Sequence, residues 1–374
     1  MNKNIALPLA LALLGSACRA QTGPVAHDSV DLDTMIGQMI LVGFRGTEVD
    51  EIAPIYSDVV DHKVGGIILF EYDVPSRTRP RNIASPEQVR RLISTIRSWS
   101  DDPLFVAIDQ EGGRVDRLKE RYGFPRSVSA QWLGSIDEED TTRVYSSRTA
   151  SLLAGLGLNV NFAPVVDVDL NPENPIIGAI ERSFSADPAI VARNAAWFIE
   201  EHRKHGVAAV LKHFPGHGSS KGDTHLGLVD VTDTWRPSEL NPYRRLIQDG
   251  LADGVMTAHV VHRGLDSSGV SSTLSDRVIG GLLRDSLSFD GVVFSDDLQM
   301  GAIRDHYDLE EVILRAIRAG VDVLTFGNNT VYEPDVAARA IETIRTLVAR
   351  GEITRGRIEA SYTRIMELKS RLAH

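Results

Sequence analysis

Residues 292–298 read Val-Val-Phe-Ser-Asp-Asp-Leu, an apolar run that leads directly into two adjacent carboxylates. An apolar run without polar alternation is typical of a strand that is buried on both faces. Seven other runs of this kind recur along the chain, with amphipathic segments between them. The predicted strands are residues 40–44, 66–70, 104–109, 159–164, 208–214, 255–259, 292–296 and 322–326.

Helical patterns fill the intervals between these runs. In residues 86–99, 190–205 and 309–319 the apolar side chains recur close to the 3.6-residue period of an amphipathic helix. Eight buried strands that alternate with helices predict the α/β class and a single (β/α)8 TIM-type barrel. A doubly wound open sheet is the alternative.

Polar residues gather where the apolar runs end. Since barrels of this type build their active sites at the carboxyl ends of the strands, these side chains are expected to line one mouth. They are Asp109, Lys212, His213, His259, Asp296 and Asn328.

Composition limits the class of partner. The chain has 374 residues, of which 43% are hydrophobic, so it can bury a large core. Its formal net charge is -11, from 51 acidic and 40 basic residues, and no run of Lys and Arg offsets it locally. Nucleic acid is therefore not an expected partner. Nothing in the sequence indicates an oligomer, and a monomer is the default.

The first 20 residues have the composition of an export signal. Lys3 lies in a short polar start, and residues 5–15 form an apolar stretch that is too short to span a bilayer. Cys18, the only cysteine of the sequence, is a candidate for a lipid anchor, although Gly15 stands where such signals usually carry leucine. Simple secretion with cleavage near Ala20 is the alternative.

The organisation expected after the signal is simple. Residues 21–30 are polar and aperiodic, as in a linker, and residues 31–374 are expected to form the catalytic barrel. Both forms of the signal place the protein outside the cytoplasm, in the periplasm or cell envelope, where a lipid anchor would attach it to the membrane.

The two carboxylates after the run at 292–296 differ in expected role. Side chains of a strand alternate between its faces, so only one of Asp296 and Asp297 is expected to face the mouth, and the alternation does not choose between them. Asp297 is the candidate for capping the helix that follows.

The most polar loop follows the run at 208–214. Residues 212–218 read Lys-His-Phe-Pro-Gly-His-Gly, and Asp223-Thr224-His225 comes five residues later. Asp223 can orient the imidazole of His225 and raise its proton affinity, as an acid/base group requires.

A metal site is the alternative for this loop. Three imidazoles belong to it, those of His213, His217 and His225, but their spacing fits no tight ligand pattern, and Pro215 disfavours the helix on which paired ligands commonly sit. No metal and no other cofactor is expected.

A third segment, residues 105–117, carries an apolar run into Asp109 and then into a turn with Arg114 and Arg117. Carboxylate and guanidinium groups placed together can bind sugar hydroxyls through charge-assisted hydrogen bonds. The segment is therefore a candidate for substrate binding.

These segments resemble glycoside hydrolase family 3, in particular its β-N-acetylglucosaminidase branch, from about Asp31 onwards. The matching motifs are residues 212–218 with 223–225, residues 109–117, the Ile-Glu-Arg-Ser-Phe of 180–184, and the Phe-Ser-Asp-Asp-Leu of 294–298.

The resemblance implies roles for individual residues. Asp296 is the expected nucleophile, His225 the proton donor and Asp223 its orienting partner, in a retaining exo-acting enzyme. The resemblance implies an enzyme that removes terminal β-linked N-acetylglucosamine from peptidoglycan fragments or chitin-like oligosaccharides. The residues expected to bind the sugar are Asp109, Arg117, Arg182, Lys212 and His213.

Three alternatives remain open at this stage. Because His225 is uncharged when it acts as a base, phosphate could replace water, which would make the protein a β-N-acetylglucosaminide phosphorylase. A non-catalytic glycan-binding lipoprotein would keep the sugar contacts without turnover. The third alternative is a metal-dependent barrel hydrolase.

Overall fold

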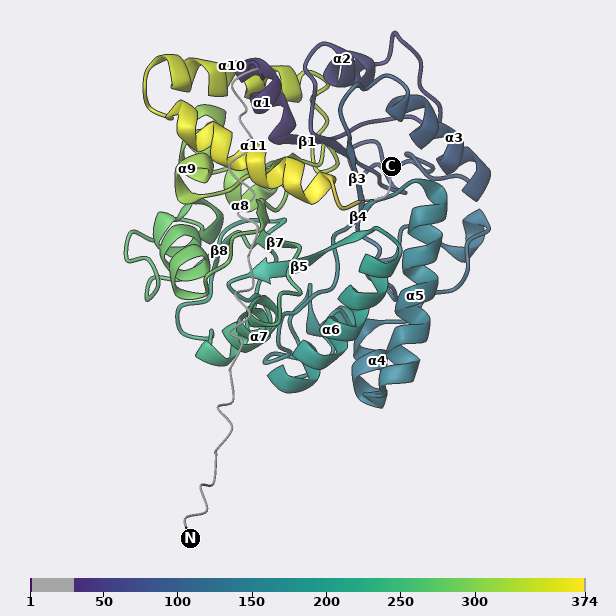
Figure 1. The fold of residues 1–374 in the computed structure, drawn as a ribbon, viewed down its shortest axis with the longest axis vertical. Coiled ribbons are helices and arrows are strands. Elements are labelled where there is room, and N and C mark those ends of the chain that lie inside the picture. The colour runs from purple at the N-terminus through teal and green to yellow at the C-terminus, as the bar shows by residue number, and fades with distance from the viewer. Residues whose placement is uncertain (2–29, 373–374) are drawn as a thin grey trace. The chain divides into compact units, whose positions relative to one another are not determined.

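Eight parallel strands pair in one sheet of order β10-β1-β2-β3-β4-β5-β7-β9 (Figure 1). The coordinates are those of a computed structural model, which describes Met1 and residues 30–372. The strands are β1 (Ile40–Gly43), β2 (Gly66–Ile68), β3 (Phe105–Ile108), β4 (Val160–Asn161), β5 (Ala208–Phe214), β7 (Gly254–Thr257), β9 (Val292–Phe294) and β10 (Leu324–Phe326).

The two ends of this sheet meet, which closes it into a barrel. Phe294 of β9 forms a parallel bridge with Val323, just before β10, and the N–H of Ser295 donates to the Val323 carbonyl at 2.9 Å. The predicted (β/α)8 barrel is therefore confirmed, and the doubly wound open sheet is excluded. All eight predicted strands are present, although most end one or two residues earlier than their apolar runs.

Helices lie between the strands along the chain. Three were predicted, and they are α3 (Pro86–Arg97), α6 (Pro188–Lys204) and α9 (Leu309–Ala319). The other α-helices are α1 (Leu32–Gln38), α2 (Pro54–Val60), α4 (Ala130–Ile136), α5 (Glu139–Leu156), α7 (Asn241–Gln248), α8 (Gly301–Arg304), α10 (Val336–Ala349) and α11 (Arg355–Lys369).

Shorter elements lie in the connections. They include a small parallel pair, β6 (Val229–Asp230) with β8 (Val260–Val261), which the sequence did not reveal because each strand has only two residues. The remaining elements are the 3-10 helices η1 (Glu120–Tyr122), η2 (Gly178–Ile180), η3 (Pro237–Leu240) and η4 (Ser272–Leu274), and the π-helix η5 (Arg277–Ser286).

Aromatic side chains fill the inside of the barrel. The ring of Phe294 lies 5.7 Å from that of Phe105 and 5.5 Å from that of Phe162, and all three residues are almost fully buried. β3 and β9 are on opposite sides of the barrel, so these contacts cross its interior. The barrel is therefore a packed core that supports the polar groups at the carboxyl ends of its strands.

The amino end of the barrel is covered by α1 and α11, which contact each other (Figure 1). Lys369 at the end of α11 is 1% exposed, and its Nζ donates to Gln38 Oε1 at 2.5 Å. The same ammonium lies 4.8 Å from the centre of the Phe105 ring at the start of β3. The C-terminal helix thus places a cation beneath the barrel core.

The predicted signal and linker, with Cys18, fall on residues 1–30, nearly all of which lie outside the described part of the chain. Within the described residues, no helix combines the length and the apolar character needed to cross a membrane.

Candidate active site

A cavity of about 550 Å³ opens at the carboxyl ends of the strands. Its walls come from the segments that follow β2, β3, β5, β9 and β10, which are far apart in the sequence. Seven of the eight predicted site residues line it: Asp109, Arg117, Arg182, Lys212, His213, His225 and Asp296. The eighth, Asp223, is hydrogen-bonded to His225.

The floor of the cavity is a network of two cations and two carboxylates. Lys212 is 2% exposed, and its Nζ lies 2.7 Å from Asp109 Oδ1 and 2.6 Å from Glu111 Oε1. Arg182 donates to both oxygens of Glu111, at 2.8 Å each. Burial alone would raise the pKa of Glu111, but Arg182 and Lys212 outweigh it and lower the pKa to about 2. The floor is therefore a rigid set of charged donors and acceptors.

Lys212 and His213 reach the cavity through an irregularity in β5. The pairing of β5 with β7 shifts register between Leu211 and Phe214, so β5 has one extra residue there. A bulge of this kind redirects side chains beside a site. The imidazole of His213 is fixed by Asp167, whose Oδ2 accepts from Nδ1 at 2.7 Å.

The tautomer of His213 follows from its two contacts. Nδ1 lies 2.7 Å from Asp167 Oδ2, and Nε2 lies 3.2 Å from the Arg182 guanidinium, which has only donors, so the Arg182 N–H points at the ring nitrogen. Asp167 is fully buried and also accepts the backbone N–H of His217 at 2.7 Å. Burial raises its pKa, but His213 and His217 outweigh this effect and hold the pKa below its usual range.

Asp296 lies two residues beyond the end of β9. Its Oδ1 accepts the backbone N–H of Asp297 at 2.8 Å. Burial opposes ionisation of this carboxyl, but the neighbouring His259, His213 and His225 outweigh it, so the pKa of Asp296 lies below its usual range. The group is therefore a carboxylate over most of the pH scale, as a nucleophile requires.

Two predictions about Asp297 are wrong. Both Asp296 and Asp297 line the cavity, because β9 already ends at Phe294 and strand alternation does not extend to them. Asp297 Oδ1 accepts the backbone N–H groups of Gln299 at 3.0 Å and Gly327 at 2.9 Å. It therefore joins the turns after β9 and β10, and α8 begins further on without a side-chain cap.

His259, predicted at the mouth, lies fully buried beside this turn. Its Nε2 donates to the backbone carbonyl of Asp297 at 2.9 Å, and its Nδ1 lies 2.8 Å from Thr273 Oγ1. Burial lowers its pKa. Asn328, also predicted there, is buried and donates to the carbonyl oxygens of Gly43 and Glu333. Both residues support the backbone of the mouth.

His225 and Asp223 form a pair at the rim. Asp223 Oδ1 accepts from His225 Nδ1 at 2.7 Å and from the backbone N–H of His225 at 2.8 Å, which leaves Nε2 available. Burial lowers the pKa of His225, but the hydrogen bond to Asp223 and the charge of Asp296 outweigh it, and the net shift is upward. The His225 side chain is 55% exposed, so solvent weakens this effect.

The loop that carries His225 is attached to the element that follows Asp296. The N–H of Gly301 donates to the carbonyl of His225 at 3.2 Å, and the N–H of Ala302 donates to that of Thr224 at 3.1 Å. Gly301 and Ala302 are the first residues of α8. The position of the loop that carries His225 is therefore coupled to the turn that carries the two aspartates.

Sequence reasoning assigned no role to three carboxylates of the site, Glu71, Glu111 and Asp167. Glu111 follows Asp109 by two residues, and Asp167 follows the apolar Val165-Val166, so each had the same signal as the assigned groups. Glu71 lines the cavity, is 3% exposed and forms ion pairs with Arg79, Lys119 and Arg121.

The imidazoles of the loop after β5 do not gather into a ligand set. His213 is bound to Asp167, and His225 to Asp223. Within residues 30–372, no group of three or more His, Cys, Asp or Glu side chains is arranged to hold a metal ion.

The family model described as "Glycosyl hydrolase family 3 N terminal domain" matches residues 31–368. The chain belongs to glycoside hydrolase family 3. The predicted family is therefore confirmed, as is the predicted class of enzyme, a glycoside hydrolase. The non-catalytic alternative is not retained.

Individual relatives agree with this membership. The chain is 37% identical to Beta-hexosaminidase LpqI of Mycobacterium tuberculosis over 346 residues, which is 89% of this chain and 81% of the relative. It is 36% identical to a Beta-hexosaminidase of Idiomarina loihiensis over 273 residues, 71% of this chain and 77% of the relative.

A solved structure shows how far the similarity in fold extends. It is a glycoside hydrolase family 3 beta-N-acetylglucosaminidase from Paenibacillus sp. str. FPU-7, with a TM-score of 0.84 and 34% identity. The match covers 92% of this chain and 63% of that chain, so the family 3 chain described here spans less than two thirds of its length.

Proposed function

We propose that the protein is a retaining, exo-acting β-N-acetylglucosaminidase in which Asp296 is the nucleophile. One observation carries this proposal: the ionised Asp296 and the Asp223–His225 pair, whose imidazole has a raised pKa, meet at one cavity. A double displacement uses an ionised nucleophile and a protonated acid that flank the glycosidic bond.

In the first step, an oxygen of Asp296 attacks the anomeric carbon, and the bond to the leaving-group oxygen breaks. His225 gives its proton to that oxygen, so the alcohol departs neutral. Asp223 accepts from Nδ1 and thereby aims Nε2 at the bond. In the second step, neutral His225 takes a proton from water, whose oxygen attacks the anomeric carbon and releases Asp296.

The charged floor supports recognition of one terminal sugar. Asp109, Arg182, Lys212 and His213 hold one another in fixed positions, and their remaining donor and acceptor sites face the cavity. Arg117 lies 3.5 Å from Asp109 at the side of this set. Such an array binds ring hydroxyls with defined directions, and it closes the cavity at one end, which supports exo action.

For the natural substrate, we propose peptidoglycan fragments rather than neutral chitin oligosaccharides. The mouth supports this choice, because three cations, Arg79, Lys119 and Arg121, converge on the single carboxylate of Glu71. The cluster has an excess of positive charge in a protein whose formal net charge is -11. A leaving group that carries a carboxylate would be attracted there.

The test is release of nitrophenol from the β-N-acetylglucosaminide and the β-glucoside, with Asp296→Ala beside the unaltered protein. Activity confined to the N-acetyl sugar and lost in Asp296→Ala supports the proposal. The control is Asp290→Ala, since Asp290 is 89% exposed, precedes β9 and does not line the cavity. Full activity of Asp296→Ala would refute the nucleophile, and rapid cleavage of the glucoside would refute the specificity.

Addition of phosphate separates hydrolysis from phosphorolysis. We expect free N-acetylglucosamine as the product at every phosphate concentration, because water is the acceptor in the proposed second step. Formation of the sugar 1-phosphate in proportion to added phosphate would contradict that step.

We also propose that the protein is exported to the cell envelope, and that Cys18 carries a lipid anchor. The apolar stretch at 5–15, followed by small residues and one cysteine, supports this proposal. Cell fractionation of the unaltered protein and of Cys18→Ala provides the test. The unaltered protein is expected with the membranes and the variant in the soluble exported fraction, whereas equal distribution of the two would exclude the anchor.

A further inference from the structure

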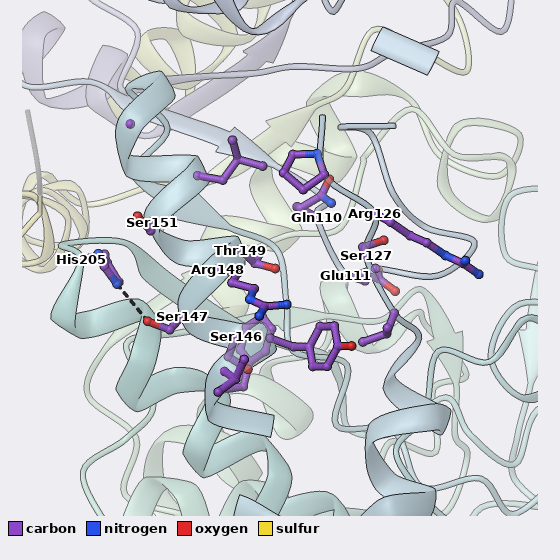
Figure 2. A pocket seen from close by; sticks show the side chains of 18 of the residues that line it. Gln110, Glu111, Arg126, Ser127, Ser146, Ser147, Arg148, Thr149, Ser151 and His205 are labelled. Atoms are coloured by element: carbon purple, nitrogen blue, oxygen red, sulfur yellow. Dashed lines mark hydrogen bonds between the residues drawn. The ribbon is translucent and has the colours of Figure 1, made fainter. Parts of the chain in front are cut away.

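Two hollows outside the catalytic cavity adjoin each other beside α5. The first encloses about 760 Å³ between α5 and the segment after β3, and Figure 2 shows its lining. The second, of about 920 Å³, lies between the same segment and α4. Both are lined by Arg126, Ser127, Val128, Tyr145 and Arg148, so they form one continuous depression.

Two aromatic side chains border this depression. Trp132 of α4 is 40% exposed, and its ring meets that of Tyr145 edge to face, with centroids 5.3 Å apart. The two rings together form an aromatic surface beside the hollow that is open to a ligand. Such a ring offers an apolar face to the C–H groups of a pyranose, while the sugar hydroxyls remain free to form hydrogen bonds.

Two arginines in the centre of the depression are available to a ligand. Arg126 and Arg148 are exposed, and within the described residues neither has an ion-pair partner; Arg148 lies 5.4 Å from the Tyr145 ring. Of the acidic residues in the first hollow, Glu111 is already bound by Lys212 and Arg182. Asp116, Glu120 and Glu181 line only the second hollow, and Asp116 already accepts hydrogen bonds from Gln110 and Ser127.

We propose that this depression is an accessory carbohydrate site that binds a glycan chain bearing carboxylates. Trp132 and Tyr145 would stack against sugar rings, and Arg126 and Arg148 would pair with carboxylates, for which a planar guanidinium is well shaped. The concave form and the hydroxyls of Ser127, Ser147, Thr149 and Ser151 favour a glycan over a protein partner, which would need a flatter and more apolar core.

The site lies next to the catalytic region. Gln110, Glu111 and Gly112 line the first hollow, and Glu111 also belongs to the floor of the catalytic cavity. Lys119 and Arg121 line the second hollow and pair with Glu71 at the catalytic mouth. A polymer anchored at Trp132 is therefore held beside the opening at which its chain ends are cleaved, which raises their local concentration.

The test uses peptide-free peptidoglycan strands, in which N-acetylglucosamine alternates with the carboxylated N-acetylmuramic acid, and neutral chitohexaose. Binding is measured on the full chain with Asp296→Ala to prevent cleavage, and with excess N-acetylglucosamine to fill the catalytic cavity. Trp132→Ala and the double variant Arg126→Gln/Arg148→Gln are compared with Arg244→Gln/Arg277→Gln, which removes two exposed arginines elsewhere.

We expect both site variants to bind the carboxylated strands about tenfold more weakly, and the control pair to bind like the parent protein. Cleavage of the nitrophenyl sugar, measured with Asp296 restored, should stay within about twofold of the unaltered protein, since that substrate fills only the catalytic cavity. This readout shows that the variants fold, and it separates failure of the accessory site from failure of the catalytic assignment.

Two results would overturn the proposal. The first is undiminished binding of the carboxylated strands by both site variants. The second is equal affinity of the parent protein for the carboxylated strands and for chitohexaose, which would show that the carboxylates have no role. Measurement of the oligomeric state by sedimentation provides a further test. If the unaltered protein forms a dimer that Trp132→Ala dissociates, the depression is an interface between copies, and the accessory site is rejected.

Discussion

At the scale of single residues, the proposed nucleophile and the proposed acid have opposite shifts in pKa. Asp296 is held below its usual value of 3.8 and His225 above 6.5. Turnover requires ionised Asp296 and protonated His225, so kcat/KM should form a plateau between these two titrations. The acid limb should lie below pH 3.8 and the alkaline limb above pH 6.5.

This prediction is checked by the pH dependence of kcat/KM on the nitrophenyl sugar. In His225→Ala the alkaline limb should disappear, because no proton donor remains to be lost. The variant should also lose least activity with leaving groups that depart without a proton. An alkaline limb that persists unchanged in His225→Ala would assign it to another group.

Glu111 leads to a prediction about stability. Glu111→Gln removes the charge between Lys212 and Arg182, and loss of one partner from a buried ion pair costs about 3–5 kcal/mol. Denaturant unfolding measures the loss. The control is Glu310→Gln on the surface, whose exposed pair with Arg350 should contribute less than about 1 kcal/mol. Equal losses for the two variants would contradict a structural role of Glu111.

The sequence revealed the individual site residues better than their partners. Asp109, Lys212, His213 and Asp296 stood out because each directly follows an apolar run or ends it. Pairs such as His213 with Asp167, or Arg182 with Glu111, join different strands, and a linear pattern does not show which side chains meet across a barrel. Asp297 was misjudged for a related reason, since the point at which β9 ends depends on its pairing.

At the scale of elements, the loop that carries the proposed acid/base residue His225 depends on its contact with α8. A Cβ at Gly301 would lie 2.8 Å from the carbonyl oxygen of His225, so Gly301→Val should displace the loop. We expect kcat to fall at least about tenfold for substrates whose leaving group needs a proton, and less for nitrophenyl sugars. Steady-state kinetics on both kinds of substrate measure this difference.

Gly356→Val is the matched control for this prediction, because a Cβ at Gly356 meets no atom within 4 Å. It should leave both activities near those of the unaltered protein. Equal losses with both kinds of leaving group in Gly301→Val would show that the substitution acts on the whole site, and the specific link to His225 would be rejected.

The strands and helices themselves could largely be predicted from the sequence. Eight buried strands appeared as apolar runs, since strands inside a closed barrel are apolar on both faces, and α9 was predicted with its observed bounds. The β6–β8 pair and η5 were not visible. A two-residue strand has too few side chains to show a period, and hydrophobic periodicity does not reveal the i→i+5 hydrogen bonds that make η5 a π-helix.

At the scale of the whole molecule, the barrel is closed at its amino end by α11, which carries the buried Lys369. Burial lowers the pKa of Lys369 to about 7, compared with 10.5 for the free side chain. Between these two values the unfolded chain binds more protons than the folded protein, so the contribution of Lys369 to stability increases as the pH rises from 7 to 10.5. Below pH 7 the folded state carries the full cost of the buried charge.

Lys369→Met keeps the length of the side chain and removes its charge. The variant should therefore unfold at a higher temperature than the unaltered protein at pH 7, and the advantage should shrink as the pH approaches 10.5. Calorimetry at several pH values measures both effects. Lys204→Met is the control, because Lys204 is 60% exposed and its partner Glu201 keeps a second ion pair with Arg143. A lower unfolding temperature for Lys369→Met at pH 7 would mean that the bond to Gln38 and the contact with Phe105 outweigh the cost of burial.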